Sequence, residues 1–208
     1  MCPRMKGPAT PLVGSGDPAG GSDWVVESTT SLLRREPWIE VFEEHIRLPD
    51  GRLVDDFYTI RLRNFVVVAP LTDEGELVVV RHYRHGPKHM TYSLPSGFIE
   101  GDETPAAAAR RELLEETGYA ADQWSALGSY VVDGNRRCGV EHVFLATGAR
   151  RVGVPSSHDL AESVVALKSV KDAVEMLWSG DISELASASG IALALLRQHE
   201  TAKSTSGA

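Results

Sequence analysis

Apolar residues that alternate with polar ones, or that form short continuous runs, divide most of the chain into strands. Asp50-Gly51 and Asp73-Glu74-Gly75 have the composition of hairpin turns between neighbouring strands. Each run is bounded by turn-forming residues, which favours strands over helices. The predicted strands are Ile39–Leu48, Val54–Leu62, Phe65–Pro70, Leu77–Tyr83, Trp124–Val132, Glu141–Ala146 and Val164–Leu167.

Helical patterns occupy three segments, one in the middle of the chain and two near its end: Pro105–Thr117, Val170–Trp178 and Ser183–Gln198. The first has the clearest limits, because Thr104 is a good N-cap, proline suits the first turn and Gly118 is a terminator. Strands mixed with one long helix and followed by helices predict an α+β fold, an α/β/α sandwich with a mixed sheet between helices.

The two ends differ from the centre in composition. Residues 1–22 are rich in Pro, Gly, Ser and Thr, and residues 201–208 have a similar character, so both segments are expected to be disordered tails. Between them we expect an N-terminal strand extension at 23–62 and a single catalytic domain at 63–200.

Composition excludes several classes of partner. The 208 residues are 42% hydrophobic and carry a formal net charge of −8, which opposes binding to long nucleic acids. Cys2 and Cys138 are too few for a disulfide framework and are not at zinc-finger spacing. The chain shows neither the apolar core of a signal peptide nor a membrane-spanning run, so we expect a cytoplasmic protein that does not bind membranes.

Three carboxylates lie close together at the end of the central helix. Glu112 and Glu116 are four residues apart and Glu115 is three from Glu112, so all three lie along one edge. A hard divalent cation relieves the repulsion between them, which predicts a site for Mg²⁺, with Mn²⁺ possible. The alternative is a solvated acidic helix end with i,i+4 pairs such as Arg111–Glu115.

The stretch from Gly97 to Tyr119 closely resembles the Nudix box of the Nudix hydrolase superfamily. Its matching positions are Gly97, Glu103, Arg111, Glu112, Glu115, Glu116 and Gly118. The resemblance implies a metal-dependent hydrolase in which Glu112, Glu115, Glu116 and the Ser96 carbonyl hold metal. Arg111 is then expected to orient the carboxylates, with Glu103 as its partner or as a distal ligand.

Upstream segments resemble the ADP-ribose pyrophosphatase branch of this superfamily. They are Phe65–Gly75, Val78–Arg84 and Leu94-Pro95-Ser96-Gly97. The resemblance implies a homodimer paired through the N-terminal strands and a substrate pocket near Gly97 lined by arginine and aromatic residues. Arg81 and Arg84 are the candidates, and the alternative for both is a half-exposed sheet edge.

The chain departs from that branch at two places. Ser93 stands where the branch has glutamate, and Val131–Arg136 replaces an expected Ser-Pro-Gly. These departures leave the exact substrate open. Asn135 and Arg136, in the Asp133–Arg137 loop, are candidates for contacting a sugar or distal phosphate, and the alternative is a polar hairpin turn.

The expected function is hydrolysis of the pyrophosphate of a nucleoside diphosphate linked to another moiety, with ADP-ribose and other ADP-sugars foremost. A general base is expected from the Pro155–Ser163 segment. Glu162 is preferred over Asp159 because it directly precedes a strand, although a surface carboxylate without function is the alternative. A glutamate of the Nudix box is a further candidate for the base, and Glu115 is expected among the catalytic residues with Glu162 and Arg111. Two rivals are a non-catalytic nucleotide sensor with the same fold and a hydrolase of nucleoside triphosphates.

Overall fold

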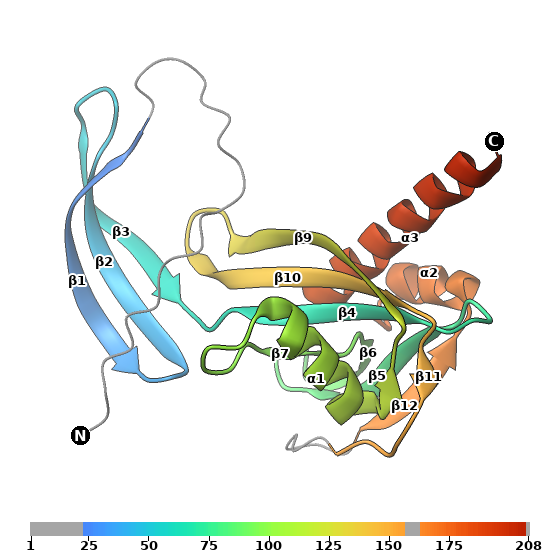
Figure 1. The fold of residues 1–208 in the computed structure, drawn as a ribbon. Helices are drawn as coiled ribbons and strands as arrows, with labels where there is room; N and C mark the ends of the chain where they lie inside the picture. Colours follow the sequence, from blue (N-terminus) through green and yellow to red (C-terminus); the bar gives the residue numbers. More distant parts are fainter. Residues whose placement is uncertain (1–22, 157–162, 207–208) are drawn as a thin grey trace.

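A long mixed sheet covered by helices on both faces forms the centre of the protein (Figure 1). The computed structural model describes residues 23–156 and 163–206, so the predicted tail at 1–22 lies outside the described residues. The helices are α1 (Pro105–Thr117), α2 (Val170–Ser179) and α3 (Leu185–Ser206). The strands are β1 (Val25–Arg35), β2 (Ile39–Arg47), β3 (Leu53–Arg61), β4 (Phe65–Leu71), β5 (Leu77–Arg84), β6 (His89–Ser93), β7 (Ser96–Phe98), β8 (Tyr119–Ala120), β9 (Gln123–Asp133), β10 (Arg137–Thr147), β11 (Arg150–Arg151) and β12 (Val164–Lys168).

The principal strands follow the order β1-β2-β3-β10-β4-β5-β12 across the sheet. Strand β10 runs parallel to β4, while β9 pairs with β10 and β7 with β4 in antiparallel fashion. This mixture of parallel and antiparallel pairs confirms the predicted α+β sandwich. None of the helices in the described part of the chain is long and apolar enough to cross a membrane.

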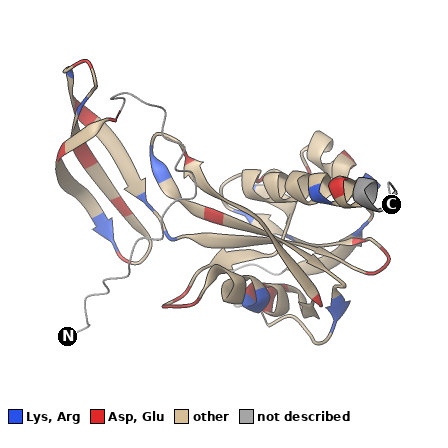
Figure 2. Ribbon diagram, turned by 45° about the horizontal axis from the view of Figure 1, so that its top comes forward, with Lys and Arg blue, Asp and Glu red and all other residues tan. Residues whose placement is uncertain are grey.

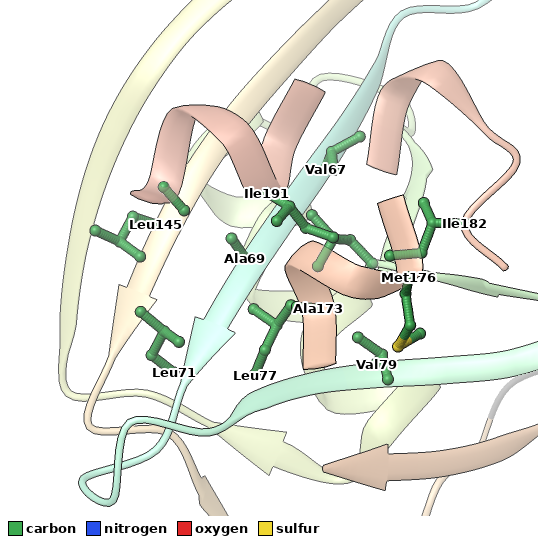
Figure 3. Packing of buried hydrophobic residues seen from close by; sticks show 12 residues of the cluster. Val67, Ala69, Leu71, Leu77, Val79, Leu145, Ala173, Met176, Ile182 and Ile191 are labelled. Atoms are coloured by element: carbon green, nitrogen blue, oxygen red, sulfur yellow. The ribbon is translucent and has the colours of Figure 1, made fainter. Parts of the chain in front are cut away.

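Strand β4 separates two hydrophobic cores. Because side chains alternate across a strand, Val66 and Val68 pack with α1, while Val67 and Ala69 pack with α2 and α3 (Figure 3). All four side chains are fully buried, and each buried valine contributes roughly 1.5–3 kcal/mol relative to an exposed one. The continuous apolar run of β4 therefore follows from its burial on both faces.

The first three strands form a sheet that projects from the core (Figure 1). A single backbone pair, Arg137 with Ile60, joins β10 to β3, and every residue of β1 is exposed. Several acidic residues also lie on these strands (Figure 2). Several large apolar side chains of the projecting segment are exposed: Trp24, Val25, Val26, Leu32, Leu33, Trp38, Leu53 and Tyr58.

Two features differ from the predictions. The sequence of β1 shows no regular alternation of apolar and polar residues, so it gave no individual strand prediction. In the structure, register shifts interrupt the pairing of β1 with β2. The predicted tail at 201–208 was wrong for residues 201–206, which continue α3 through Ser206. The segment after Gln198 has no Pro or Gly before Gly207 to stop the helix, and Thr201 Oγ1 donates a hydrogen bond to Arg197 O at 3.0 Å.

Candidate active site

Helix α1 begins and ends as its sequence predicts. The Thr104 side chain accepts a hydrogen bond from the Ala107 amide, Pro105 occupies the first turn, and Gly118 ends the helix in a left-handed conformation with φ of 72°. A Cβ on Gly118 would also press on the backbone of Gly153. The helix bounds are therefore set by local chemistry that these residue types supply.

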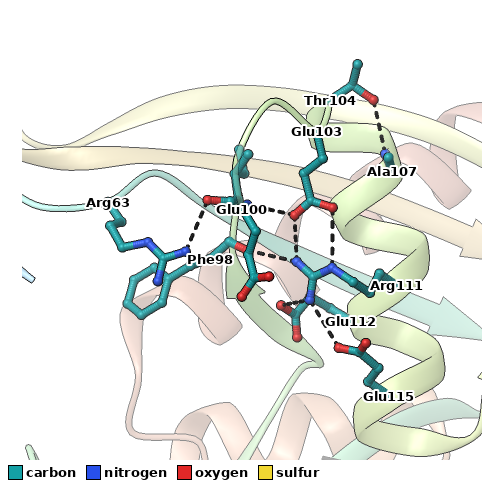
Figure 4. Close-up of polar contacts among 10 residues, drawn as sticks. Arg63, Phe98, Glu100, Glu103, Thr104, Ala107, Arg111, Glu112 and Glu115 are labelled. Carbon is teal, nitrogen blue, oxygen red and sulfur yellow. Dashed lines mark hydrogen bonds and ion pairs between the residues drawn. The ribbon is translucent and has the colours of Figure 1, made fainter. Parts of the chain in front are cut away.

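Arg111 lies at the centre of the carboxylates of α1 and the preceding loop (Figure 4). Its Nη1 contacts Glu112 Oε1 at 2.7 Å and Glu115 Oε2 at 3.1 Å, while its Nη2 contacts Glu103 Oε1 at 2.6 Å. Arg111 Nη2 also donates to Phe98 O at 3.0 Å. One guanidinium group thus ties the carboxylates of the helix to the loop that precedes it.

The loop and the helix approach so closely at Gly97 that a side chain there would displace a carboxylate of the cluster. A Cβ on Gly97 would overlap the Glu112 carboxylate. Next to it, the Ser96 amide donates a hydrogen bond to Glu116 Oε2 at 3.0 Å, and Glu116 is buried. Strand β7 is held in turn by pairing with β4, where Gly97 lies opposite Val66. The core strand therefore fixes where the Glu112 and Glu116 carboxylates lie.

Two of the carboxylates differ in their electrostatic environment. The hydrogen bond from Arg111 holds the pKa of Glu103 below its usual range. Burial raises the pKa of Glu112, and Arg111 opposes that shift. Glu112 is thus a partly desolvated carboxylate that favours a cationic neighbour.

The donor chemistry of this cluster fits a hard divalent cation. Several carboxylates of α1 and its loop surround a single guanidinium group, so negative charge is in excess. In the described residues, no three His, Cys, Asp or Glu side chains converge in a metal-binding group. Arg111 instead draws Glu112 and Glu115 to itself.

A sequence model of the NUDIX domain matches residues 61–182. The chain belongs to the NUDIX domain family. Its active helix, glycine turn and flanking strands are those of a Nudix hydrolase, and the match covers all of α1 and the strands that support it.

Curated relatives place this Nudix hydrolase in the ADP-ribose pyrophosphatase-like branch. The chain is 26% identical over 161 residues to the ADP-ribose pyrophosphatase of Bacillus subtilis (strain 168), covering 77% of this chain and 86% of that protein. It is 29% identical over 154 residues to the ADP-ribose pyrophosphatase of Mycobacterium tuberculosis (strain ATCC 25618 / H37Rv), covering 71% and 72% respectively.

A solved structure shares the fold. The crystal structure of an ADP compounds hydrolase superposes with a TM-score of 0.74 at 17% identity, covering 88% of this chain and 97% of that one. At this identity the likeness concerns the architecture.

The candidate substrate arginines of β5 contact residues away from the carboxylate cluster. Arg81 Cζ lies 5.9 Å from the centre of the Tyr92 ring, and Arg84 Nε lies 2.9 Å from Glu184 Oε1. Burial raises the pKa of Glu184, and Arg84 opposes that shift. The structure therefore gives each arginine a partner beside the α2–α3 layer.

The hairpin between β9 and β10 is built as a tight polar turn. Asp133 Oδ1 accepts hydrogen bonds from the amides of Asn135 at 2.8 Å and Arg136 at 2.6 Å. Arg136 O in turn accepts from the Ile60 amide of β3 at 2.9 Å. The turn thus lies at the junction between the Nudix domain and the projecting strands.

The candidate bases Glu162 and Asp159 lie outside the described residues.

Sequence reasoning did not single out Arg63. Its Cζ lies 4.6 Å from the centre of the Phe98 ring, and its Nη2 donates to Ile99 O at 3.3 Å (Figure 4). Arg63 is 35 residues before Phe98, and the motif carries no signal for a partner at that distance. Only the pairing of β4 with β7 brings the two together.

Proposed function

We propose that this Nudix hydrolase cleaves the pyrophosphate of a nucleoside diphosphate linked to a second moiety, ADP-ribose foremost among ADP-sugars. The products are a nucleoside monophosphate and a sugar phosphate. The observation that carries the proposal is the carboxylate cluster of α1, tied by Arg111 to a loop in which Gly97 lies directly against the Glu112 carboxylate. The named activities of the B. subtilis and M. tuberculosis relatives support the substrate class.

The proposed cofactor is Mg²⁺, with Mn²⁺ as a substitute. Glu112, Glu115 and Glu116 are proposed to hold it, together with the backbone carbonyl of Ser96. When bound, such an ion neutralises diphosphate charge and activates water. The buried position of Glu116 and the desolvated carboxylate of Glu112 support their assignment as ligands.

The chain's own groups supply the positioning. Arg111 binds the acidic side chains of α1 and also donates to the Phe98 carbonyl, so it fixes the position of the helix carboxylates relative to the loop. Glu103 accepts a further hydrogen bond from the same guanidinium group. Glu162 is proposed as the general base that takes a proton from water, with Asp159 as the other candidate from the same segment.

A substrate panel tests the proposal. The purified chain is incubated with ADP-ribose, other nucleoside diphosphate sugars, dinucleotides and nucleoside triphosphates, with Mg²⁺ or with a chelator. We expect AMP from ADP-ribose only when the metal is present. If the chain released pyrophosphate from a nucleoside triphosphate faster than AMP from ADP-ribose, the proposed substrate class would be wrong and nucleoside triphosphates would take its place. No turnover of any compound would favour a binding module.

The projecting strands predict a homodimer. An exposed three-stranded sheet with many apolar side chains presents the kind of surface that a second copy covers. Light scattering is expected to give twice the chain mass of 22.6 kDa. Leu32→Asp, on β1, should shift the protein to the monomer mass, whereas Leu196→Asp, at an even more exposed leucine on α3, should not. A wild-type monomer at micromolar concentration contradicts the prediction.

The β9–β10 hairpin is proposed to select the substrate. Replacing Arg136 by alanine removes a guanidinium group but keeps the backbone bond from Ile60. We expect kcat/KM for the best substrate to fall, mainly through a higher KM. The fall should correspond to a loss of roughly 1.5–3 kcal/mol in transition-state binding free energy. Arg52→Ala, in the exposed β2–β3 turn, is the control. An unchanged substrate ranking and unchanged kcat/KM in Arg136→Ala would reduce the hairpin to a turn.

A further inference from the structure

The linker between the projecting strands and the Nudix domain, residues 62–64, contacts the active-site loop directly. Strand β3 ends at Arg61 and β4 begins at Phe65. Within this linker, Asn64 O accepts a hydrogen bond from the Ile99 amide at 3.0 Å, and Asn64 Oδ1 accepts from the Val140 amide at 3.0 Å. The linker is thus bonded to the loop on one side and to β10 on the other.

Arg63 adds a second connection to the same loop. Its guanidinium group lies over the Phe98 ring and donates to Ile99 O. Arg111, on helix α1, donates a hydrogen bond to the carbonyl of the preceding residue, Phe98 O. Two guanidinium groups therefore donate hydrogen bonds to two successive backbone carbonyls of the loop. Arg111 of helix α1 binds Phe98 O, and Arg63 of the linker binds Ile99 O (Figure 4).

The held segment is the one that places the metal-binding groups. Gly97 lies against the Glu112 carboxylate and Ser96 bonds to Glu116, one and two residues before Phe98. Arg63 is only partly exposed and also contributes a favourable charge to the Glu103 carboxylate. A change in the position of Phe98 is transmitted to Gly97 through a single peptide unit.

We infer that Arg63 is a positioning residue for the active-site loop, which it holds from the side opposite Arg111. The inference rests on the proposed metal-dependent hydrolysis. It adds a role for the linker that neither the motif nor the Nudix helix provides. Because the linker directly follows β3, the loop geometry also depends on how the projecting strands are attached.

Arg61 provides a matched control. Its Cζ lies 4.7 Å from the centre of the Phe42 ring, so it makes the same kind of stack on a phenylalanine, and its Nη1 contacts Glu40 Oε2 at 2.8 Å where Arg63 donates to a backbone carbonyl. All of its partners lie within the projecting sheet. Arg61→Ala and Arg63→Ala therefore each remove a guanidinium group stacked on a phenylalanine ring, one inside the projecting sheet and one beside the active-site loop.

The test measures Mn²⁺ binding by calorimetry without substrate, together with kcat, KM and the melting temperature. In Arg63→Ala we expect Mn²⁺ affinity and kcat to fall about tenfold or more, the loss typical of outer-sphere partners of a metal site. KM should change less than twofold. Arg63→Lys, which retains the charge over Phe98, should recover most of the loss, and Arg61→Ala should match wild type.

Hydrogen exchange in the absence of metal separates this inference from the proposed function. Residues 96–100 should exchange faster in Arg63→Ala than in wild type or Arg61→Ala, whether or not the wild type turns over ADP-ribose. Phe98→Leu, which removes only the ring, should give the same change to a smaller degree. Unchanged exchange and unchanged Mn²⁺ affinity in Arg63→Ala would overturn the inference, as would a drop in melting temperature alone. A wild type that neither binds Mn²⁺ nor hydrolyses the panel refutes the proposed function instead.

Discussion

Glu116→Gln is expected to lose at least 10²-fold in kcat at saturating Mg²⁺ while keeping the fold. The amide has nearly the same shape as the carboxylate, and its oxygen can still accept the hydrogen bond from the Ser96 amide. It lacks the negative charge that a divalent cation requires. Losing one metal ligand forfeits several kcal/mol of charge stabilisation, and each 1.36 kcal/mol is a tenfold change in rate.

Glu175→Gln is the control for this substitution. Glu175 lies on the exposed surface of α2 and contacts Lys171 at 3.8 Å. The substitution therefore removes the same charge as Glu116→Gln, but from a helix outside the carboxylate cluster. Its kcat and melting temperature should match wild type, since exposed ion pairs contribute little. Near-normal turnover in Glu116→Gln would remove Glu116 from the metal-ligand set.

Gly97→Ala is expected to disable the site through a single methyl group. The new Cβ would overlap the Glu112 carboxylate, which Arg111 holds at 2.7 Å. The carboxylate must move out of its place, and misplacement by about 1 Å can cost on the order of 10²-fold in rate. We expect kcat to fall by this order, with circular dichroism and oligomer mass unchanged.

Gly86→Ala controls for the loss of a glycine. A Cβ on Gly86, in the β5–β6 turn, meets no heavy atom within 4 Å, and the residue does not need a left-handed backbone. Its kinetics should equal those of wild type. If Gly97→Ala retained full activity, the close approach of loop and helix would have no role in placing Glu112.

The active helix was largely predictable from sequence because its determinants are local. Thr104, Pro105 and Gly118 set its limits within one turn of each end, and the structure shows each in its expected role. The pairing of Arg111 with Glu115 also follows from helical spacing. Gly97 was predictable as a motif position, but the overlap with Glu112 that explains it required the structure.

Contacts between distant segments were not predictable. Arg63 reaches Phe98 only because β4 and β7 pair, and Arg84 meets Glu184 only because the chain before α3 returns beside β5. Nothing in the sequence near either arginine indicates its partner. The predicted strand Leu77–Tyr83 contained Arg81 and ended one residue before Arg84, which the structure places at the end of β5, and it left the neighbours of both arginines open.

Irregular strands were also missed for a physical reason. Strand β1 contains two register shifts, and β6 and β7 have five and three residues, so none shows enough alternation to be recognised. The core strand β4 was recognised because burial on both faces demands a continuous apolar run.

The most direct test of this account is the hydrolysis of ADP-ribose by the wild-type chain, with and without Mg²⁺, followed by chromatographic identification of the products. The account predicts AMP and ribose 5-phosphate in equal amounts, formed only with the metal and abolished by a chelator. Equal turnover in the presence of the chelator, or no AMP at any metal concentration while the protein is folded, would contradict it.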